Sequence, residues 1–218
     1  MSGSFPIFDA ACEHLIGAIA PARALDIGAG AGKYGRLLAQ AAPACERVAI
    51  EIEPGHVERF ALRELYSRVD AADAGQWWRT HGDEAFDLVI AGDCLQQMPK
   101  SEGLDLLNAL VYRSAWLLLV VPEFVVQGAI EGLASAVHRA AWSERDLAWH
   151  DLWAWDNTRS VTLALLRGYR PAAVPIDTLV RQLNDAHVPL RDYDGAGFVR
   201  PARLRLVDQP REAAYRPR

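Results

Sequence analysis

The chain has few of the residues that stabilise secreted proteins or bind nucleic acids. It contains only three cysteines, Cys12, Cys45 and Cys94, an odd number with irregular spacing. These predict neither a disulfide framework nor a zinc site, so we expect no metal. Basic residues are outnumbered by acidic ones, and the formal net charge is -5. A negative chain gives no support for a phosphate-binding surface, so no nucleic-acid partner is expected.

Long hydrophobic runs are also missing. The most apolar stretch, LLLVVPEFVV, is interrupted by Pro122 and is too short to span a bilayer. The N-terminus lacks the basic and apolar regions of a signal peptide. We therefore expect a soluble cytoplasmic protein that does not associate with membranes.

The most informative stretch that is present reads ALDIGAGAGKYGRLL. Its apolar start, Ala24 to Ile27, is typical of a buried parallel strand. Gly28, Gly30 and Gly32 then alternate with small residues, and glycine permits a positive φ and a close approach of ligand to backbone. Lys33 to Gln40 has helical spacing, so its first N–H groups point back at the turn. The pattern predicts a polar cradle for a nucleoside-bearing cofactor.

Two cofactor classes fit this cradle. Gly30, Gly32 and Gly35 satisfy the GxGxxG pattern of dinucleotide-binding proteins, which alone is weak evidence. Asp26 with Gly28, Gly30 and Gly32 instead fits the motif of S-adenosylmethionine enzymes. A third interpretation is a glycine turn needed only for tight packing of strand against helix.

The next predicted strand, Arg47 to Ile52, also favours a nucleoside. Glu51 lies near its end, about 20 residues after the glycines, where an acid can accept both ribose hydroxyls. Glu53 lies on the opposite face of a period-two strand, so we expect it to be a solvated acid. Pro54 then begins a helix, predicted over residues 55–65.

At this point the chain resembles the class I S-adenosylmethionine-dependent methyltransferases. The matching stretches follow the order and gaps of that family from about residue 25 to residue 168. They are LDIGAGAG (25–32), VAIEIEP (48–54), RVDAADA (68–74), FDLVIAGDCLQQMP (86–99) and WLLLVVP (116–122).

The resemblance implies roles for individual residues. Asp26 and the three alternating glycines would hold the methionine part of the cofactor, and Glu51 the ribose. Asp73 with Ala74 would flank the adenine, although Asp70 competes with Asp73 for this role, and Asp93 would lie beside the transferable methyl group. The full set expected to bind the cofactor is Asp26, Gly28, Gly30, Gly32, Tyr34, Glu51, Ile52, Asp73, Ala74 and Asp93.

The fold implied is α/β, a three-layer Rossmann-like sandwich around a mostly parallel seven-stranded sheet. A period-two pattern from Trp149 to Gly168 predicts its C-terminal antiparallel β-hairpin, with the turn at Asp156 and Asn157. Residues 1–168 would form the cofactor-binding domain, in which residues 1–22 carry an N-terminal helix. Ser101 is predicted to cap a helix between the fourth and fifth strands.

The acceptor side departs from the family pattern. Many relatives have a histidine where this chain has Gln97, and a glutamine cannot take a proton. The stretch from Glu123 to Ala141, where the acceptor pocket is expected, is predicted to be helical. His138 within it is the candidate general base, because a histidine pKa suits proton removal near neutrality. The competing interpretation is a partly exposed helix histidine with no catalytic role.

Residues 169–218 form a C-terminal extension beyond the family core. Ile176 to Ala186 predicts a helix, and residues 204–207 an added strand. The extension would be either a lid over the acceptor pocket or an arm gripping a second subunit in a homodimer. Tyr193 and Arg200 would reach a substrate only in the lid arrangement.

Three functions compete. The first is methyl transfer from S-adenosylmethionine to a small-molecule acceptor, at nitrogen or oxygen, with release of S-adenosylhomocysteine. The second is a reaction at another carbon of the same sulfonium, releasing methylthioadenosine, or binding without chemistry. The third, an NAD-dependent oxidoreductase, is disfavoured because neither of the two lysines, Lys33 and Lys100, follows a tyrosine by four residues.

Overall fold

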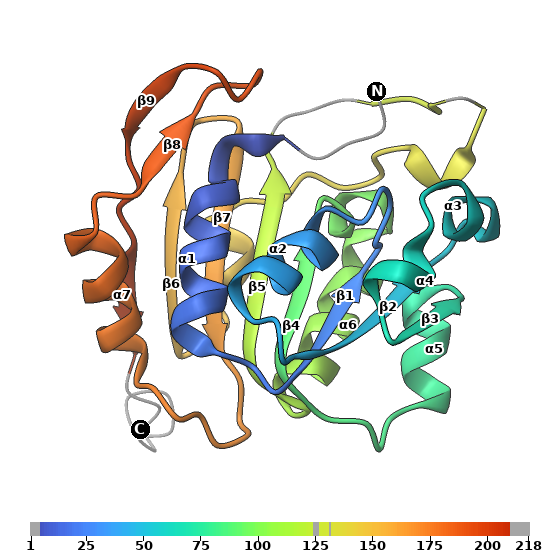
Figure 1. Cartoon of the computed structure of the whole chain (residues 1–218), viewed down its shortest axis with the longest axis horizontal. Helices are drawn as coiled ribbons and strands as arrows, with labels where there is room; N and C mark the ends of the chain where they lie inside the picture. The colour runs from blue at the N-terminus through green and yellow to red at the C-terminus, as the bar shows by residue number, and fades with distance from the viewer. Residues whose placement is uncertain (1–4, 124–126, 131, 210–218) are drawn as a thin grey trace, which may run out of the picture.

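The computed structural model describes residues 5–123, 127–130 and 132–209. It is a three-layer α/β sandwich, as predicted, built on a sheet with the strand order β10-β6-β7-β5-β4-β1-β2-β3 (Figure 1). The strands are β1 (Arg23–Ile27), β2 (Glu46–Glu51), β3 (Arg68–Ala71), β4 (Phe86–Gly92), β5 (Ser114–Pro122), β6 (Leu152–Asn157), β7 (Val161–Arg167) and β10 (Arg205–Asp208). Strands β5, β4, β1, β2 and β3 are mutually parallel, and β7 and β6 form the predicted antiparallel hairpin.

The sheet has eight strands rather than the seven expected. The additional strand is β10 from the C-terminal extension, which pairs antiparallel with β6 and places Leu206 opposite Ala154. An edge strand such as β6 would otherwise present unpaired N–H and C=O groups. The added strand predicted at residues 204–207 is therefore the eighth strand of the main sheet.

Helices cover both faces of the sheet (Figure 1). They are α1 (Asp9–Ile19), α2 (Lys33–Ala41), α3 (Pro54–Arg59), α4 (Leu62–Leu65), α5 (Ala74–Thr80), α6 (Lys100–Val111) and α7 (Ile176–Asp185). Alternate side chains of the buried strands divide between two apolar layers, as a period of two requires. In β1, Leu25 and Ile27 belong to the apolar layer that contains residues of α5 and α6, whereas Ala24 belongs to the layer that contains residues of α1, α2 and α7.

Two helix predictions were wrong. The single helix expected over residues 55–65 is split into α3 and α4 by Ala61, whose φ of 48° lies in the left-handed region. The helix expected between Glu123 and Ala141 is replaced, among the described residues of that stretch, by irregular backbone with one 3₁₀ turn at Ala134–Ala136. Gly132 has a φ of 79° there, which a continuous helix does not allow.

Some boundaries also differ from the prediction. Helix α6 begins at Lys100 with Pro99 at its N-cap and no side-chain cap, so Ser101 does not cap it. The hairpin turn falls after Asn157, so Asp156 and Asn157 belong to β6. Element ends depend on local hydrogen bonds that apolar periodicity does not report.

The C-terminal extension is built into the same core. The buried face of α7 joins the apolar layer of α1, and β8 (Pro189–Arg191) pairs with β9 (Phe198–Pro201) in a separate small sheet. No helix in the described part of the chain is long and apolar enough to cross a membrane. No group of metal-ligating side chains occurs among the residues described.

Candidate functional site

The glycine turn after β1 has the backbone that the sequence predicts. Gly28, Gly30 and Gly32 have φ values of 73°, 51° and 78°. A Cβ on Gly28 would lie 2.8 Å from the Cβ of Cys94, and one on Gly32 would lie 2.6 Å from Leu65. The turn therefore requires glycine both for its conformation and for its packing at these two positions.

Glu51 holds this turn in place from the end of β2. It is 4% exposed, and its Oε2 accepts a hydrogen bond of 2.7 Å from the backbone N–H of Gly30. Its Oε1 accepts from the N–H of Glu53 at 2.9 Å and lies 3.3 Å from His56 Nδ1. The sequence predicted only a ribose-binding role, whereas the structure gives this carboxylate a second task in shaping the turn.

Asp26, on β1 beside the turn, is fully buried. The hydroxyl of Tyr66, which follows α4, donates to Asp26 Oδ2, while Oδ1 has no hydrogen-bond partner among the described residues. Burial raises the pKa of Asp26 to about 7; the Tyr66 hydrogen bond opposes this rise, and the charge of Glu51 adds to it. A buried acid with an unsatisfied oxygen is a feature typical of ligand-binding sites.

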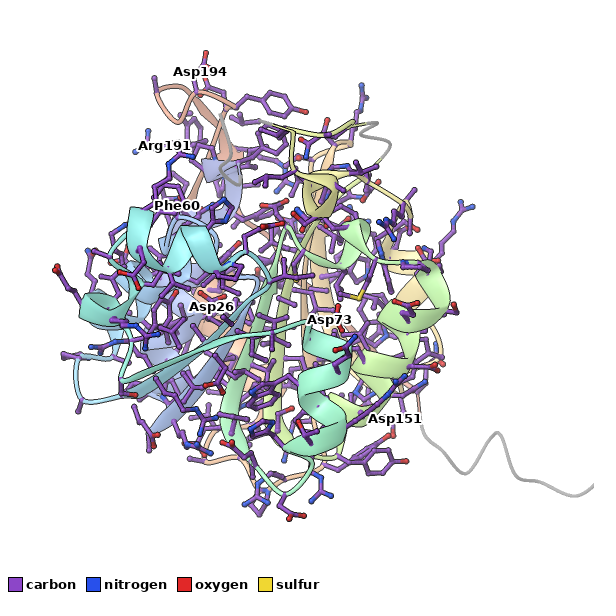
Figure 2. All side chains as sticks on the ribbon, turned by 90° about the vertical axis from the view of Figure 1, so that its right-hand side faces the viewer. Asp26, Phe60, Asp73, Asp151, Arg191 and Asp194 are labelled. Atoms are coloured by element: carbon purple, nitrogen blue, oxygen red, sulfur yellow. The ribbon has the colours of Figure 1, made fainter. Side chains whose placement is uncertain are left out.

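A cavity of about 140 Å³ opens beside the turn at the carboxyl edge of the sheet. Ile52, 47% exposed, and Ala72 to Ala74 line it after β2 and β3. Figure 2 shows Asp73 at the start of α5. Its Oδ1 accepts from the N–H of Gln76 at 2.9 Å. Asp70, the competing candidate for adenine, instead accepts from Trp77 Nε1 at 2.6 Å, which favours Asp73.

The irregular segment after β5 forms the roof of this cavity. Ser135 and Arg139 line the cavity, and the hydroxyl of Ser135 donates to the carboxylate of Glu53. The backbone N–H of Arg139 donates to the carbonyl of Gln96 at 2.7 Å. Glu53 is therefore not the solvated acid that the sequence predicted, because Ser135 of the roof contacts it just after the end of β2.

Tyr34 and Asp93 occupy the other end of the site. The Tyr34 ring is buried against Gly92, where any Cβ would overlap it, and its hydroxyl has no partner among the described residues. Asp93 follows β4 with a φ of 55°, and its N–H donates to the carbonyl of Val120 at 2.8 Å. The strained backbone at Asp93 is typical of functional sites.

The N-terminal helix is anchored beside the glycine turn. Lys33 Nζ, at the start of α2, lies 2.5 Å from Asp9 Oδ1 and 2.8 Å from the carbonyl of Phe5. This contact joins the beginning of α1 to the helix that follows the glycines. The first helix is therefore held next to the start of α2.

The candidate residues on the acceptor side are only partly brought together. Gln97 and Cys94 line the cavity, and burial raises the pKa of the Cys94 thiol, which packs as a small hydrophobe. His138 is half-buried. In the sequence it lies between Ser135 and Arg139, which both line the cavity, but His138 itself does not line it. Its catalytic role stays a prediction.

Two residues at the candidate site, Tyr66 and Ser135, were not predicted from the sequence. Tyr66 lies 40 residues from Asp26 in the chain, and Ser135 lies 82 residues from Glu53. Neither residue belongs to a motif. The one signal was Gly35, whose missing side chain leaves room for the Tyr66 ring.

No protein-family model matches the chain, and no curated protein matches it. Solved structures do. The plantazolicin methyltransferase BpumL, in complex with a monoazolic desmethylPZN analog and S-adenosylhomocysteine, is 13% identical, covers 76% of this chain and 85% of its own, and has a TM-score of 0.57.

Two further structures are similar. The N-methyltransferase NodS from Bradyrhizobium japonicum WM9, in complex with S-adenosylhomocysteine, is 17% identical over 74% of this chain and 86% of its own, with a TM-score of 0.54. The N-terminal domain of EvdMO1 with S-adenosylhomocysteine bound is 15% identical over 75% of this chain and 81% of its own, with a TM-score of 0.55. The chain therefore has the Rossmann-like fold of the S-adenosylmethionine-dependent methyltransferases.

Proposed function

We propose that the chain is a class I S-adenosylmethionine-dependent methyltransferase acting on a small-molecule acceptor. The observation that carries this proposal is the turn of three left-handed glycines held by Glu51 beside a cavity lined by Ile52 and Ala72 to Ala74. This arrangement offers backbone and carboxylate groups to a polar ligand part and apolar walls to a planar base. The bound product in the similar structures supports the same ligand.

The residues present fit this cofactor. Asp26 has an oxygen without a partner for the ammonium of the methionine part, and Gly28 has no room for a side chain beside the turn. Glu51 would take the ribose, and Asp73 with Ala74 the adenine. When bound, S-adenosylmethionine supplies a methyl group on positively charged sulfur, which the lone pair of the acceptor displaces in line, releasing S-adenosylhomocysteine.

The protein would contribute mainly alignment. Holding two reactants in line can account for about 7–11 kcal/mol in the best intramolecular cases. None of the described residues lining the cavity is a histidine. This supports a nucleophilic acceptor, such as an amine, which needs no strong base, and His138 would serve as the base if the acceptor is an alcohol.

The proposal also covers the compartment in which the enzyme works and its partners. Cys12, Cys45 and Cys94 are free and buried, which supports a reducing compartment, the cytoplasm. We expect no nucleic-acid partner. The exposed Phe198 and Val199 on β9 support a role for the C-terminal extension in covering an acceptor or contacting a second copy.

Product analysis tests the proposal. The purified protein is incubated with methyl-labelled S-adenosylmethionine and a panel of amines, phenols and carboxylates. Label in an acceptor together with S-adenosylhomocysteine supports methyl transfer, whereas methylthioadenosine would show attack on the aminobutyrate arm. Retention of a nicotinamide dinucleotide with no uptake of S-adenosylhomocysteine would overturn the proposal.

A further inference from the structure

Tyr66 and Asp26 form a buried pair that no motif predicts. Asp26 is 0% and Tyr66 4% exposed, and the Tyr66 hydroxyl donates to Asp26 Oδ2. The other oxygen, Oδ1, is buried and has no partner among the described residues. In Figure 2, Asp26 lies between the strands and the helices of the α2 and α4 layer. A carboxyl group held by one oxygen leaves the second available for a ligand.

The chain makes specific room for this pair. A Cβ on Gly35, in the first turn of α2, would lie 2.5 Å from the Tyr66 ring and 2.6 Å from its hydroxyl. Any side chain at Gly35 would therefore displace the tyrosine from Asp26. Gly35 is the third glycine of the GxGxxG pattern. The packing of Tyr66 accounts for it, so a bound pyrophosphate is not needed to explain this glycine.

The groups that face Asp26 do not neutralise its charge. Glu51 on β2 is acidic, and burial raises the pKa of both Tyr34 on α2 and Cys94 after β4, which keeps them uncharged. No cationic side chain in the described part of the chain forms an ion pair or a hydrogen bond with Asp26. A buried carboxylate with one neutral donor is stabilised when a positive ligand arrives.

We propose that Tyr66 is a positioning residue: its hydroxyl holds the Asp26 carboxylate so that Oδ1 receives the ammonium group of an amino-acid ligand. This inference rests on the proposed function, in which that ammonium belongs to the methionine part of the cofactor. Binding then requires ionised Asp26. Below a pH of about 7 the ligand must displace a proton from this carboxyl group, and its affinity falls.

The loss of the hydroxyl has a defined consequence. A hydrogen bond to a charged group stabilises it by about 1.5–3 kcal/mol, which corresponds to one to two pKa units. Without it, the pKa of Asp26 rises. The pH at which affinity falls should then move upward by about one unit, and affinity at pH 7 should drop about tenfold.

Calorimetric titration with S-adenosylhomocysteine tests this from acidic pH to about one and a half units above the pKa of Asp26, which is about 7, in buffers of different ionisation enthalpy. The wild type should release about one proton on binding at pH 6. Tyr66→Phe should bind with the shifted pH profile, and Asp26→Asn should release no proton. Tyr112→Phe, at a tyrosine that is 66% exposed, is the matched control and should behave as the wild type.

The outcomes separate the two proposals. If the wild type binds and Tyr66→Phe keeps both its affinity and its pH profile, Tyr66 has no positioning role, while the proposed function stands. If the wild type binds no S-adenosylhomocysteine at any pH, both fail.

A second measurement covers the case in which Tyr66→Phe does not fold. Carbon NMR of the wild type follows Asp26 Cγ and Tyr66 Cζ across the same pH range. Both signals should titrate with one midpoint, and that midpoint should fall when ligand is added. Independent titration of the two signals would overturn the inference.

Discussion

At the scale of single residues, the candidate site contains an acid that opposes folding. Asp26 ionises readily in the unfolded chain, but burial raises its pKa to about 7 in the folded protein. The folded state therefore binds the proton more tightly than the unfolded state. The contribution of Asp26 to the free energy of unfolding is therefore complete below a pH of about 4, and it is lost as the pH rises through about 7.

Asp26→Asn should remove this dependence. Relative to the variant, the free energy of unfolding of the wild type should fall by about 1.4 kcal/mol for each pH unit between the unfolded and folded pKa values. Asparagine keeps a carbonyl oxygen to accept from Tyr66. Urea denaturation at pH 5 and pH 8 without ligand measures the effect, and parallel pH profiles for the two proteins would contradict it.

Glu51 holds the glycine turn, and the proposed function also assigns it the ribose of the cofactor. Glu51→Gln should weaken the binding of S-adenosylhomocysteine about ten- to a hundredfold, because charge-assisted hydrogen bonds to the ribose contribute about 1.5–3 kcal/mol. Calorimetry measures the affinity. Glu58→Gln, on the exposed side of α3, is the control and should have no effect. Equal affinities for the two variants would remove Glu51 from the ribose site.

At the scale of elements, the described part of the roof after β5 lines the cavity with Ser135 and Arg139. Ser135→Ala should accelerate the dissociation of S-adenosylhomocysteine about three- to tenfold, because it removes the hydrogen bond to Glu53 that holds the roof down. Stopped-flow fluorescence measures the rate. Ser101→Ala, at an exposed position of α6, should leave it unchanged. A dissociation rate unaffected by Ser135→Ala would show that the roof does not gate the cavity.

The elements differ in how well apolar periodicity predicts them. Strands β1 and β2 were foreseen because continuous apolar runs next to turn residues indicate buried parallel strands. The break at Ala61 was not foreseen, and neither was the roof at Ser135, whose hydrogen bond to Glu53 joins residues 82 positions apart in the chain. The same limit applies to the site: the glycines and Glu51 belong to a local motif, whereas Tyr66 reaches Asp26 only in the folded chain.

The C-terminal extension is fastened to the sheet by an ion pair. Asp156 on β6 is buried, and Arg200 on β9 donates to both its carboxylate oxygens, at 2.6 and 2.9 Å. Arg200 therefore has a structural partner. Tyr193 is the other residue predicted to reach a substrate. Its ring packs against the ring of Phe5, with 5.1 Å between the ring centroids.

Arg200→Met should leave Asp156 buried without its cation. We expect a loss of about 2–3 kcal/mol in the free energy of unfolding, below the value for a fully buried pair because Arg200 is partly exposed. Urea denaturation measures it. Arg191→Met, at an exposed position of β8, should change the stability little. Equal stability of the two variants would show that the ion pair does not fasten the extension.

At the scale of the whole molecule, the carboxyl ends of four parallel strands carry the residues proposed to bind the cofactor. The glycine turn follows β1, Glu51 ends β2, Asp73 follows β3 and Asp93 follows β4, so the proposed cofactor would join segments from four neighbouring strands that form one half of the sheet. Such a ligand binds the folded state alone. Its binding free energy is therefore added to the stability of the whole chain.

S-adenosylhomocysteine at a hundred times its dissociation constant should stabilise the protein by about 2.7 kcal/mol. For a chain of this size the melting temperature should rise by about 5–10 °C, since each kcal/mol corresponds to roughly 2–4 °C. Differential scanning fluorimetry measures the shift, with a nicotinamide dinucleotide at equal concentration as the matched ligand. The dinucleotide lacks the ammonium group that would satisfy Asp26, so its shift should be near zero. A larger shift with the dinucleotide would mean that the turn and its cavity serve the other cofactor class.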